Sequence, residues 1–132
     1  MVGNDAVLRA LMQHAYRVRE LDGSSWSVKV ARPPVLTLPA DEEPFDLAIL
    51  TTQSTTLEAA LLAARHRLRP EAIIVTCQNG LPEDRAAAIV GAENVVGCVV
   101  GWGASMVELG LFERTSRGGL QLGRPGADAP DP

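Results

Sequence analysis

The residues best suited to bind a ligand form an amide-amide-glycine turn, Gln78-Asn79-Gly80, which directly follows the apolar run from Ile73 to Cys77. Such a run predicts a buried strand, and open α/β sheets bind their ligands at the carboxyl ends of the strands. Asn79 can donate and accept hydrogen bonds, and Gly80 allows a sharp turn or a close approach to a ligand. We therefore take this turn as the first candidate for a binding element.

Two other polar stretches, Thr51-Thr52-Gln53 and Gly101-Trp102-Gly103, follow strand-like runs in the same way. We expect the three polar ends to lie side by side and to form a crevice for a nucleotide-like ligand. Each stretch by itself is also explained as an ordinary turn, and Trp102 is better explained by packing than by stacking on a ligand. The sequence has no G-x-G-x-x-G phosphate loop between a strand and a helix.

The elements that would position these ends alternate between strands and helices. Short continuous apolar runs, typical of strands covered on both faces, predict strands at residues 46–50, 72–77 and 95–100. One intervening helix is predicted from the capping-box spacing of Thr55 and Glu58, and the next runs from Pro82 to about Gly91. This order predicts an α/β fold with a parallel βαβαβ core.

The segments on either side of this core have other patterns. Asn4 to Gln13 has helical spacing with Asn4 as the N-cap, and Asp22-Gly23 predicts a hairpin turn between residues 16–18 and 27–30. Residues 31–45 are expected to form an irregular connection with a short strand at Val35-Leu36. At the C-terminal end, residues 108–123 predict a β-hairpin or meander around Gly118-Gly119, and residues 124–132 predict a disordered tail.

Composition excludes several classes of function. The chain has 132 residues, 46% of them hydrophobic, and a net charge of −4, which suits one domain without a basic surface for nucleic acid. It has no apolar stretch of the roughly 20 residues that span a bilayer and no signal-peptide pattern, so we expect a cytoplasmic protein.

The side chains with possible redox or metal chemistry are better explained by structure. Cys77 and Cys98 lie in apolar strand-like runs and are expected to be free, buried thiols. His14 and His66 have no metal-ligand spacing, so no metal site is predicted. Three arginines are expected to form the solvated end of a helix: Arg65, Arg67 and Arg69.

Several of these segments together resemble the ketopantoate reductases, also called 2-dehydropantoate 2-reductases. The matching features are a strand, a helix, an apolar strand ending in Gln-Asn-Gly, and a Val-Val-Gly strand followed by Gly-Ala: residues 46–50, 56–68, 75–80, 95–97 and 103–104. Leu120–Gly123 matches the strand and glycine that close the family's meander. The resemblance covers roughly residues 3–123 and is carried most specifically by the Gln-Asn-Gly turn.

The resemblance implies a Rossmann-type domain that binds NADP and serves the reduction of a 2-oxo acid, 2-dehydropantoate, in pantothenate biosynthesis. Asn79 matches the family asparagine that contacts both cofactor and substrate at the nicotinamide end, with Gly80 beside it. Gly103 matches a backbone position that lines the cofactor site. Thr52 and Gln53 are also expected to contact the cofactor, and Gln53 stands where the family often has lysine, so a charge partner for the cofactor is lost.

The same resemblance implies that parts of the family's machinery are missing. The first βαβ unit with the glycine-rich loop is absent, and so is the helical second domain with the catalytic lysine. Lys29, the only lysine, lies in the predicted hairpin, so no catalytic residue is assigned. We expect residues 1–123 to form a partial domain that binds NADP weakly and has little or no activity alone.

Two alternatives remain open. Without the family's first strand, residues 46–50 would present an unpaired apolar edge, which favours a non-enzymatic module that completes its sheet with a partner chain or forms a homo-oligomer. The other alternative is a reading frame that begins upstream of Met1.

Overall fold

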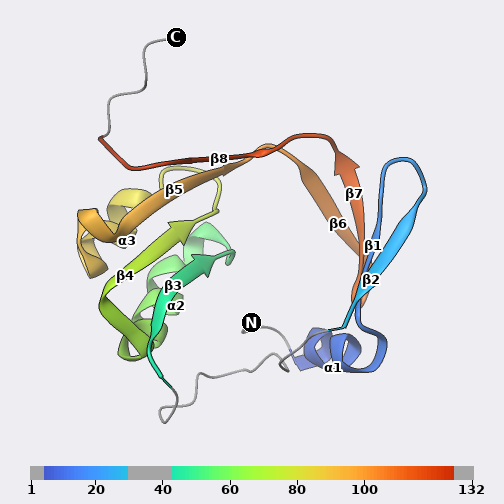
Figure 1. Cartoon of the computed structure of the whole chain (residues 1–132), viewed down its shortest axis with the longest axis horizontal. Coiled ribbons are helices and arrows are strands. Elements are labelled where there is room, and N and C mark those ends of the chain that lie inside the picture. The colour runs from blue at the N-terminus through green and yellow to red at the C-terminus, as the bar shows by residue number, and fades with distance from the viewer. Residues whose placement is uncertain (1–4, 30–42, 127–132) are drawn as a thin grey trace. The chain divides into compact units, whose positions relative to one another are not determined.

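The computed structural model describes residues 5–29 and 43–126, which belong to two compact units (Figure 1). The first unit contains residues 1–39 and 101–119, and the second contains residues 40–100 and 120–132. Each unit has its own sheet.

The second unit contains the predicted parallel core. Its sheet has the order β3-β4-β5-β8, in which the first three strands are parallel and β8 pairs antiparallel with β5. The strands are β3 (Phe45–Leu50), β4 (Leu68–Thr76), β5 (Val95–Val100) and β8 (Leu120–Gly123). The helices are α2 (Leu57–Ala64) and α3 (Glu83–Val90), with the short 3₁₀ turns η1 (Ser54–Thr56), η2 (Arg65–Arg67) and η3 (Ala92–Asn94). The α/β fold class predicted from the sequence is therefore confirmed.

Helices α2 and α3 cover one face of this sheet. Leu57 and Leu61 of α2 and Ala86 of α3 are fully buried against Ile74 of β4 and Val95 of β5. The strands that follow one another in sequence, β3, β4 and β5, are also neighbours in the sheet. Because crossovers between parallel strands are almost always right-handed, two successive crossovers in the same direction place both helices on the same face.

The opposite face corrects one expectation from the sequence. Residues 46–50 were expected to be covered on both faces, but Leu47 and Ile49 are 53% and 59% exposed, whereas Leu50 is buried. Side chains alternate between the two faces of a strand. Leu50 faces the helices, so Leu47 and Ile49 lie on the face that α2 and α3 do not cover. Within residues 43–126, β4 is the only strand that pairs with β3.

The start of α2 also differs from the prediction. The capping box of Thr55 and Glu58 does not form: the helix begins at Leu57, its N-cap is Thr56, and no side chain caps it. The carboxylate of Glu58 instead accepts hydrogen bonds from Arg85 of α3. Helix α3 ends as predicted, with Gly91 at φ 93° in a conformation that favours glycine.

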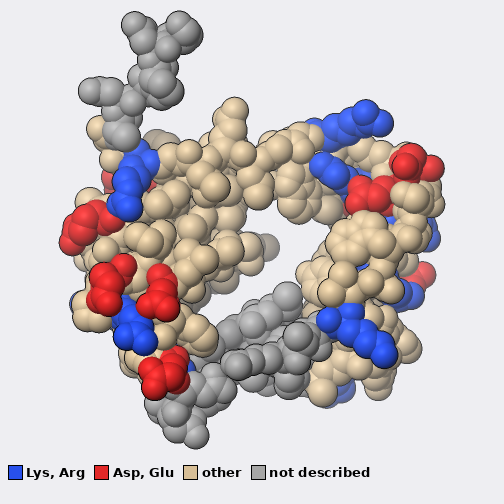
Figure 2. All heavy atoms as spheres, viewed as in Figure 1, with Lys and Arg blue, Asp and Glu red and all other residues tan. Residues whose placement is uncertain are grey.

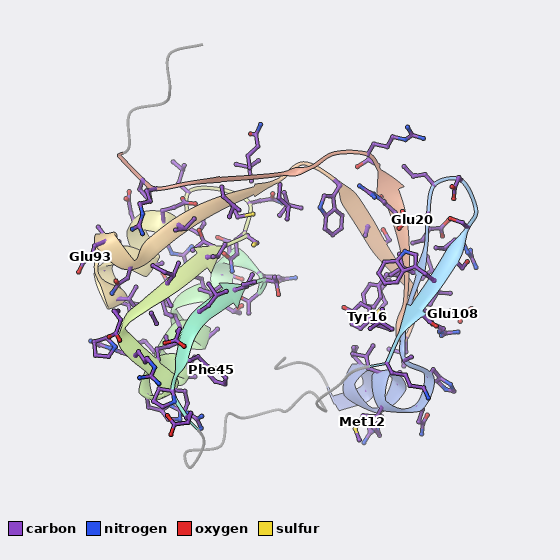
Figure 3. The ribbon with its side chains drawn as sticks, in the orientation of Figure 1. Met12, Tyr16, Glu20, Phe45, Glu93 and Glu108 are labelled. Carbon is purple, nitrogen blue, oxygen red and sulfur yellow. The ribbon has the colours of Figure 1, made fainter. Side chains whose placement is uncertain are left out.

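Arg67 is not part of a solvated helix end, as had been expected from its spacing. It is 1% exposed, and its Nη2 donates a hydrogen bond to the carbonyl oxygen of Glu43 (3.0 Å). Its guanidinium lies 5.4 Å from the ring centroid of Phe45, at the start of β3 (Figure 3). Arg69 is exposed but pairs with Asp46 at 2.9 Å. These arginines therefore hold the beginning of β3 against β4, and Figure 2 shows acidic and basic side chains interspersed over the visible face of this unit.

The first unit is a small sheet with one helix. Its strands have the order β2-β1-β7-β6, and α1 (Asp5–His14) precedes them. The strands are β1 (Tyr16–Arg19), β2 (Ser25–Val28), β6 (Gly103–Glu108) and β7 (Leu111–Ser116). The hairpin around Asp22-Gly23 is confirmed, with Ser24 donating from its backbone N and its Oγ to Asp22. Tyr16 stacks on Phe112 with ring centroids 4.7 Å apart (Figure 3).

The C-terminal hairpin forms, but its turn lies elsewhere than predicted. Strands β6 and β7 are joined at Leu109-Gly110, where Gly110 has φ 76°, and not at Gly118-Gly119. The backbone at Gly118 instead passes so close to Gly101 that an added Cβ would lie 2.1 Å from the Gly101 carbonyl oxygen. The last strand, β8, then pairs with β5 in the sheet of the second unit.

Three expectations fall outside the described residues: the Asn4 cap, the strand at Val35-Leu36 and most of the C-terminal tail. Among the residues that are described, no helix is long and apolar enough to cross a membrane. The cytoplasmic assignment stays a prediction.

Candidate functional site

The ends of β3 and β4 meet as the sequence predicted. The side-chain Nε2 of Gln78, after β4, donates a hydrogen bond to Oγ1 of Thr52, after β3 (3.3 Å). The backbone N of Cys77 also donates to the carbonyl oxygen of Leu50 (3.0 Å), which extends the pairing of the two strands to this edge. Two of the three predicted polar ends therefore lie together at the carboxyl edge of the parallel sheet.

Gln78 has an unusual environment for an amide. It is 9% exposed, and its Oε1 is buried without a hydrogen-bond partner in the part of the chain that the structure describes. A buried acceptor without a donor costs about 1–3 kcal/mol, so native proteins rarely keep one unless it has a role. The site therefore contains a buried acceptor that no donor of the described residues satisfies.

Asn79 and Gly80 follow Gln78 and are exposed. Gly80 has φ 98°, which side-chain-bearing residues rarely adopt, and an added Cβ there would meet nothing within 4 Å. Glycine is therefore required for the shape of the turn and not by crowding. The side chain of Asn79 remains available to a ligand, as do the exposed Thr52 and Gln53 on the neighbouring loop.

A charged network holds the loop after β3 in place. Arg85 of α3 pairs with both carboxylate oxygens of Glu58, and its Nη1 and Nη2 donate to Oγ and the carbonyl oxygen of Ser54 (3.1 and 2.8 Å). The hydrogen bonds from Arg85 lower the pKa of Glu58 below its usual value, and Glu58 in turn raises the pKa of Arg85. This network links the loop after β3 to the helix that follows the Gln78 turn.

The two cysteines are close to the site but are not poised for chemistry. Both are free, as predicted: Cys98 is buried and Cys77 is partly buried. Burial, together with a hydrogen bond between the two thiols, raises the pKa of Cys77 to about 11. A thiol with such a pKa stays protonated at neutral pH and is a poor nucleophile.

Glu83 has a structural role at the start of α3. Its Oε1 accepts a hydrogen bond from Oγ1 of Thr76 (3.1 Å). The same carboxylate fills the space above Gly97, where an added Cβ would lie 2.7 Å from it. The acid therefore ties α3 to β4 and β5.

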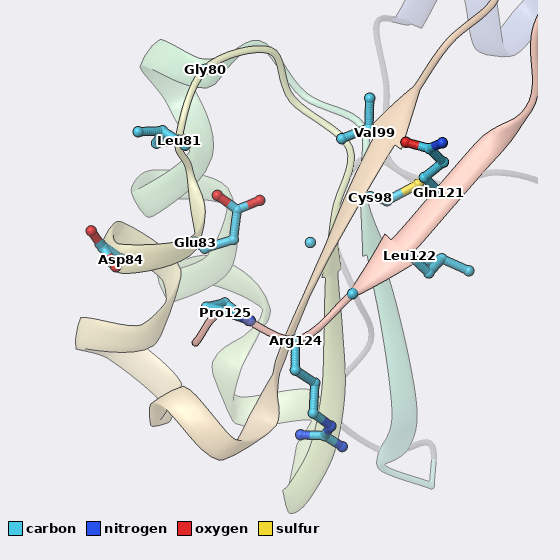
Figure 4. A pocket seen from close by; sticks show the side chains of 12 residues that line it. Gly80, Leu81, Glu83, Asp84, Cys98, Val99, Gln121, Leu122, Arg124 and Pro125 are labelled. Atoms are coloured by element: carbon cyan, nitrogen blue, oxygen red, sulfur yellow. The ribbon is translucent and has the colours of Figure 1, made fainter. Parts of the chain in front are cut away.

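A hollow of about 500 Å³ lies on the Gly80 side of the turn (Figure 4). The first turn of α3, strand β5 and the β8 strand with the residues after it form its walls. Apolar side chains such as Leu81 and Val99 line it, together with the polar groups of Glu83, Gln121 and Arg124. Of the predicted site residues, Gly80 alone reaches this hollow.

The third predicted end, Gly101-Trp102-Gly103, belongs to the first unit. The backbone N of Gly103 donates to Oγ of Ser116 (2.8 Å), and an added Cβ would lie 2.6 Å from Oγ1 of Thr115. Trp102 lies under the guanidinium of Arg114 at 5.9 Å, a packing contact of the kind expected for it. The role of Gly103 in a shared cofactor site stays a prediction.

Sequence reasoning did not assign two residues of this site. Gln78 was recognised in the turn but not as a side chain that joins two loops, because alternation along a strand does not reveal the partner of a polar side chain. Arg85 was missed because Glu58, 27 residues earlier, reaches it only through the packing of α2 against α3. For the described residues, no cluster of ligands could hold a metal ion.

The fold defines a class. A parallel sheet whose strands are joined by helices, with polar loops at the carboxyl ends, is a Rossmann-type α/β architecture, and solved structures share it. A PanE/ApbA family ketopantoate reductase from Ralstonia eutropha JMP134 superposes with a TM-score of 0.78 at 22% identity, over 92% of this chain and 39% of that one. The putative 2-dehydropantoate 2-reductase from Enterococcus faecalis gives 0.75 at 20% identity, over 91% and 38%. A D-mandelate dehydrogenase with NADH and anilino(oxo)acetate gives 0.76 at 22% identity, over 96% and 40%.

Residues 1–126 match the family model of ketopantoate reductase PanE/ApbA. The chain belongs to this family, as the Gln-Asn-Gly turn had indicated. It spans about two fifths of the length of the solved relatives.

Proposed function

We propose that this chain is the nucleotide-binding part of an NADP-dependent oxidoreductase that acts on 2-dehydropantoate, and that by itself it has little or no turnover. The observation that carries the proposal is the hydrogen bond from Gln78 to Thr52, which joins the loops after β3 and β4 at the point where the family turn is found. Family membership supports the reaction class.

The residues at this edge fit the nicotinamide end of the cofactor. Its carboxamide offers both N–H donors and a carbonyl acceptor. Asn79 offers a donor and an acceptor to cofactor and substrate, Gly80 lets the backbone come close, and Thr52 and Gln53 supply polar groups from the loop after β3. The nicotinamide, when bound, supplies the hydride that reduces the ketone of the 2-oxo acid.

Weak binding is expected from the residues of this chain. The anionic pyrophosphate is usually held by amides of a glycine-rich loop at a helix N-terminus, and the sequence has no G-x-G-x-x-G motif. The first turn of α3 carries Glu83 and Asp84, which repel an anion. Contacts at the nicotinamide end would therefore carry most of the affinity.

Fluorescence titration with NADPH and with NADH tests the cofactor assignment. Asn79→Ala is expected to weaken NADPH binding about tenfold, because one or two hydrogen bonds at about 1 kcal/mol each are lost. Gln13→Ala removes an exposed amide from α1 and serves as the matched control, with unchanged binding. Binding of NADH alone, or equal effects of both substitutions, would contradict the assignment.

An NADPH-oxidation assay with 2-dehydropantoate tests the absence of turnover. The expected result is a rate no higher than that of the Asn79→Ala variant. Measurable turnover that depends on Asn79 would contradict the proposed inactivity while leaving the cofactor assignment intact.

A further inference from the structure

The loop between β3 and α2 is held by helix α3 and not by a helix cap. Neither α2 nor the 3₁₀ turn η1 that precedes it has a side-chain N-cap. Arg85 of α3 donates instead from Nη1 to Oγ of Ser54 (3.1 Å) and from Nη2 to its carbonyl oxygen (2.8 Å). The side chain that fixes the first residue of η1 therefore comes from a helix 31 residues further along the chain.

Glu58 orients the guanidinium that makes these contacts. Its two carboxylate oxygens accept hydrogen bonds from Nε and Nη2 of Arg85, which is the bidentate geometry that arginine and a carboxylate favour. Together with the bonds to Ser54, these bonds engage all three nitrogens of the guanidinium. A lysine has the same charge but donates from a single nitrogen, so it cannot reproduce this arrangement. Arg85 therefore acts through its shape as well as its charge.

The same loop has a second, independent anchor. Gln78 donates to Oγ1 of Thr52 (3.3 Å), just before the residue that Arg85 holds. Between the two anchors, the carbonyl oxygen of Gln53 accepts from the backbone N and Oγ1 of Thr56 (both 3.0 Å). The backbone of Gln53 is thus fixed from both sides, while its side chain is exposed. The loop presents this amide from a fixed backbone at the carboxyl edge of the sheet.

A loop that is already fixed binds a ligand more tightly than a mobile one, because its conformational freedom was lost on folding and not on binding. We propose that Arg85 is a positioning residue for the cofactor: by fixing Ser54 it holds the loop so that the side chain of Gln53 meets the nicotinamide end of NADPH. Arg85 itself does not contact the cofactor. The inference rests on the proposed function and adds that a side chain of α3 sets part of the cofactor affinity.

Titration with NADPH of the full chain tests whether Arg85 acts through its geometry. Arg85→Lys keeps the charge but loses the simultaneous bonds to Glu58 and Ser54, and it is expected to raise the dissociation constant about fivefold. Arg65→Lys makes the same change at an exposed arginine of η2, at the opposite end of α2, and should leave binding unchanged. Equal dissociation constants for Arg85→Lys and the wild type, or equal effects of both substitutions, would overturn the proposal.

A double-mutant cycle separates positioning from a general loss of stability. Gln53→Ala is expected to weaken NADPH binding about threefold in the wild type, and by less than about 1.5-fold in the Arg85→Lys background, because the loop is then no longer held. If Arg85 only stabilised the packing of α2 against α3, the two effects on the dissociation constant would multiply. Multiplying effects, or no effect of Gln53→Ala in the wild type, would contradict the inference.

Amide hydrogen exchange without cofactor distinguishes the failure of this inference from the failure of the proposed function. The amide of Thr56, which bonds to the Gln53 carbonyl oxygen, should exchange at least about tenfold faster in Arg85→Lys than in the wild type. The amide of Ile74, which pairs with both neighbouring strands in the middle of the sheet, should exchange at the same rate in both. NADPH binding by the wild type with unchanged exchange at Thr56 would overturn the positioning role alone. A wild type that binds no NADPH would overturn the proposed function and this inference together.

Discussion

The two faces of the second-unit sheet come from the same apolar strands but differ in what covers them. On one face, α2 and α3 bury Ile74 and Val95 completely. On the other face, Leu47 and Ile49 remain more than half exposed. An apolar run in the sequence therefore indicates only that a strand can be covered on both faces. How many faces are covered depends on where the helices of the chain pack.

The largest change in the free energy of unfolding is expected for a substitution in α2, on the covered face of the sheet. Leu61 is fully buried beneath the sheet, so Leu61→Ala should lower the free energy of unfolding by about 3 kcal/mol, the usual cost of a leucine-sized cavity. Its neighbour Leu62 is 55% exposed, and Leu62→Ala should change stability by less than about 0.5 kcal/mol. Urea unfolding of both variants measures the difference. Similar losses would show that the outer side of α2 is also covered in solution.

A smaller effect is expected where the strands end. Gln78→Met keeps the volume of the buried side chain and removes the acceptor that has no donor, so it should raise the free energy of unfolding by up to about 1 kcal/mol. The lost hydrogen bond to Thr52 offsets part of this gain, because Thr52 is exposed and can bond to water. Thermal and urea unfolding measure the change. A loss of more than about 1 kcal/mol would mean that Oε1 is satisfied in the folded protein.

The smallest effect concerns the charged network on the covered face. Folding lowers the pKa of Glu58 from its usual 4.5, mainly through the hydrogen bonds from Arg85. The ionised Glu58 therefore stabilises the fold above pH 4.5, and this contribution is lost as the pH falls through the lowered value. Glu58→Gln should be less stable than the wild type at pH 7, with a difference that disappears in acid.

Arg85→Gln provides the control for that prediction. Without the guanidinium, replacing Glu58 should change stability little at either pH, because the partner that lowers its pKa is gone. Urea unfolding of the single and double variants at pH 7 and pH 3 measures the coupling. A pH-dependent difference that persists in the Arg85→Gln background would assign it to another group.

Much of the fold could be predicted because it depends on local patterns. Apolar runs located β4 and β5, Pro82 and Gly91 marked the ends of α3, and Asp22-Gly23 located a hairpin. The position of the site followed from the same patterns, since parallel strands end at one edge. The contact between Gln78 and Thr52 confirmed that the loops after β3 and β4 meet there.

The wrong predictions involve side chains whose partners are distant in sequence. Thr55 and Glu58 have the spacing of a helix cap, but Arg85 takes the carboxylate. Arg67 has the spacing of a solvated helix end, but the adjoining start of β3 buries it against Phe45. Long charged side chains can reach several different partners, and the local sequence does not predict which partner they contact in the folded protein.

The sequence by itself determined the family and the α/β core, because the Gln-Asn-Gly turn and the strand-helix alternation are local properties of the chain. Only the tertiary structure decided that Gln78 is buried with an acceptor that has no donor and that one face of β3 is exposed. Those properties depend on which elements pack against each strand. Burial is a property of neighbours in space, and the pattern along the chain fixes which side chains can be buried but not what covers them.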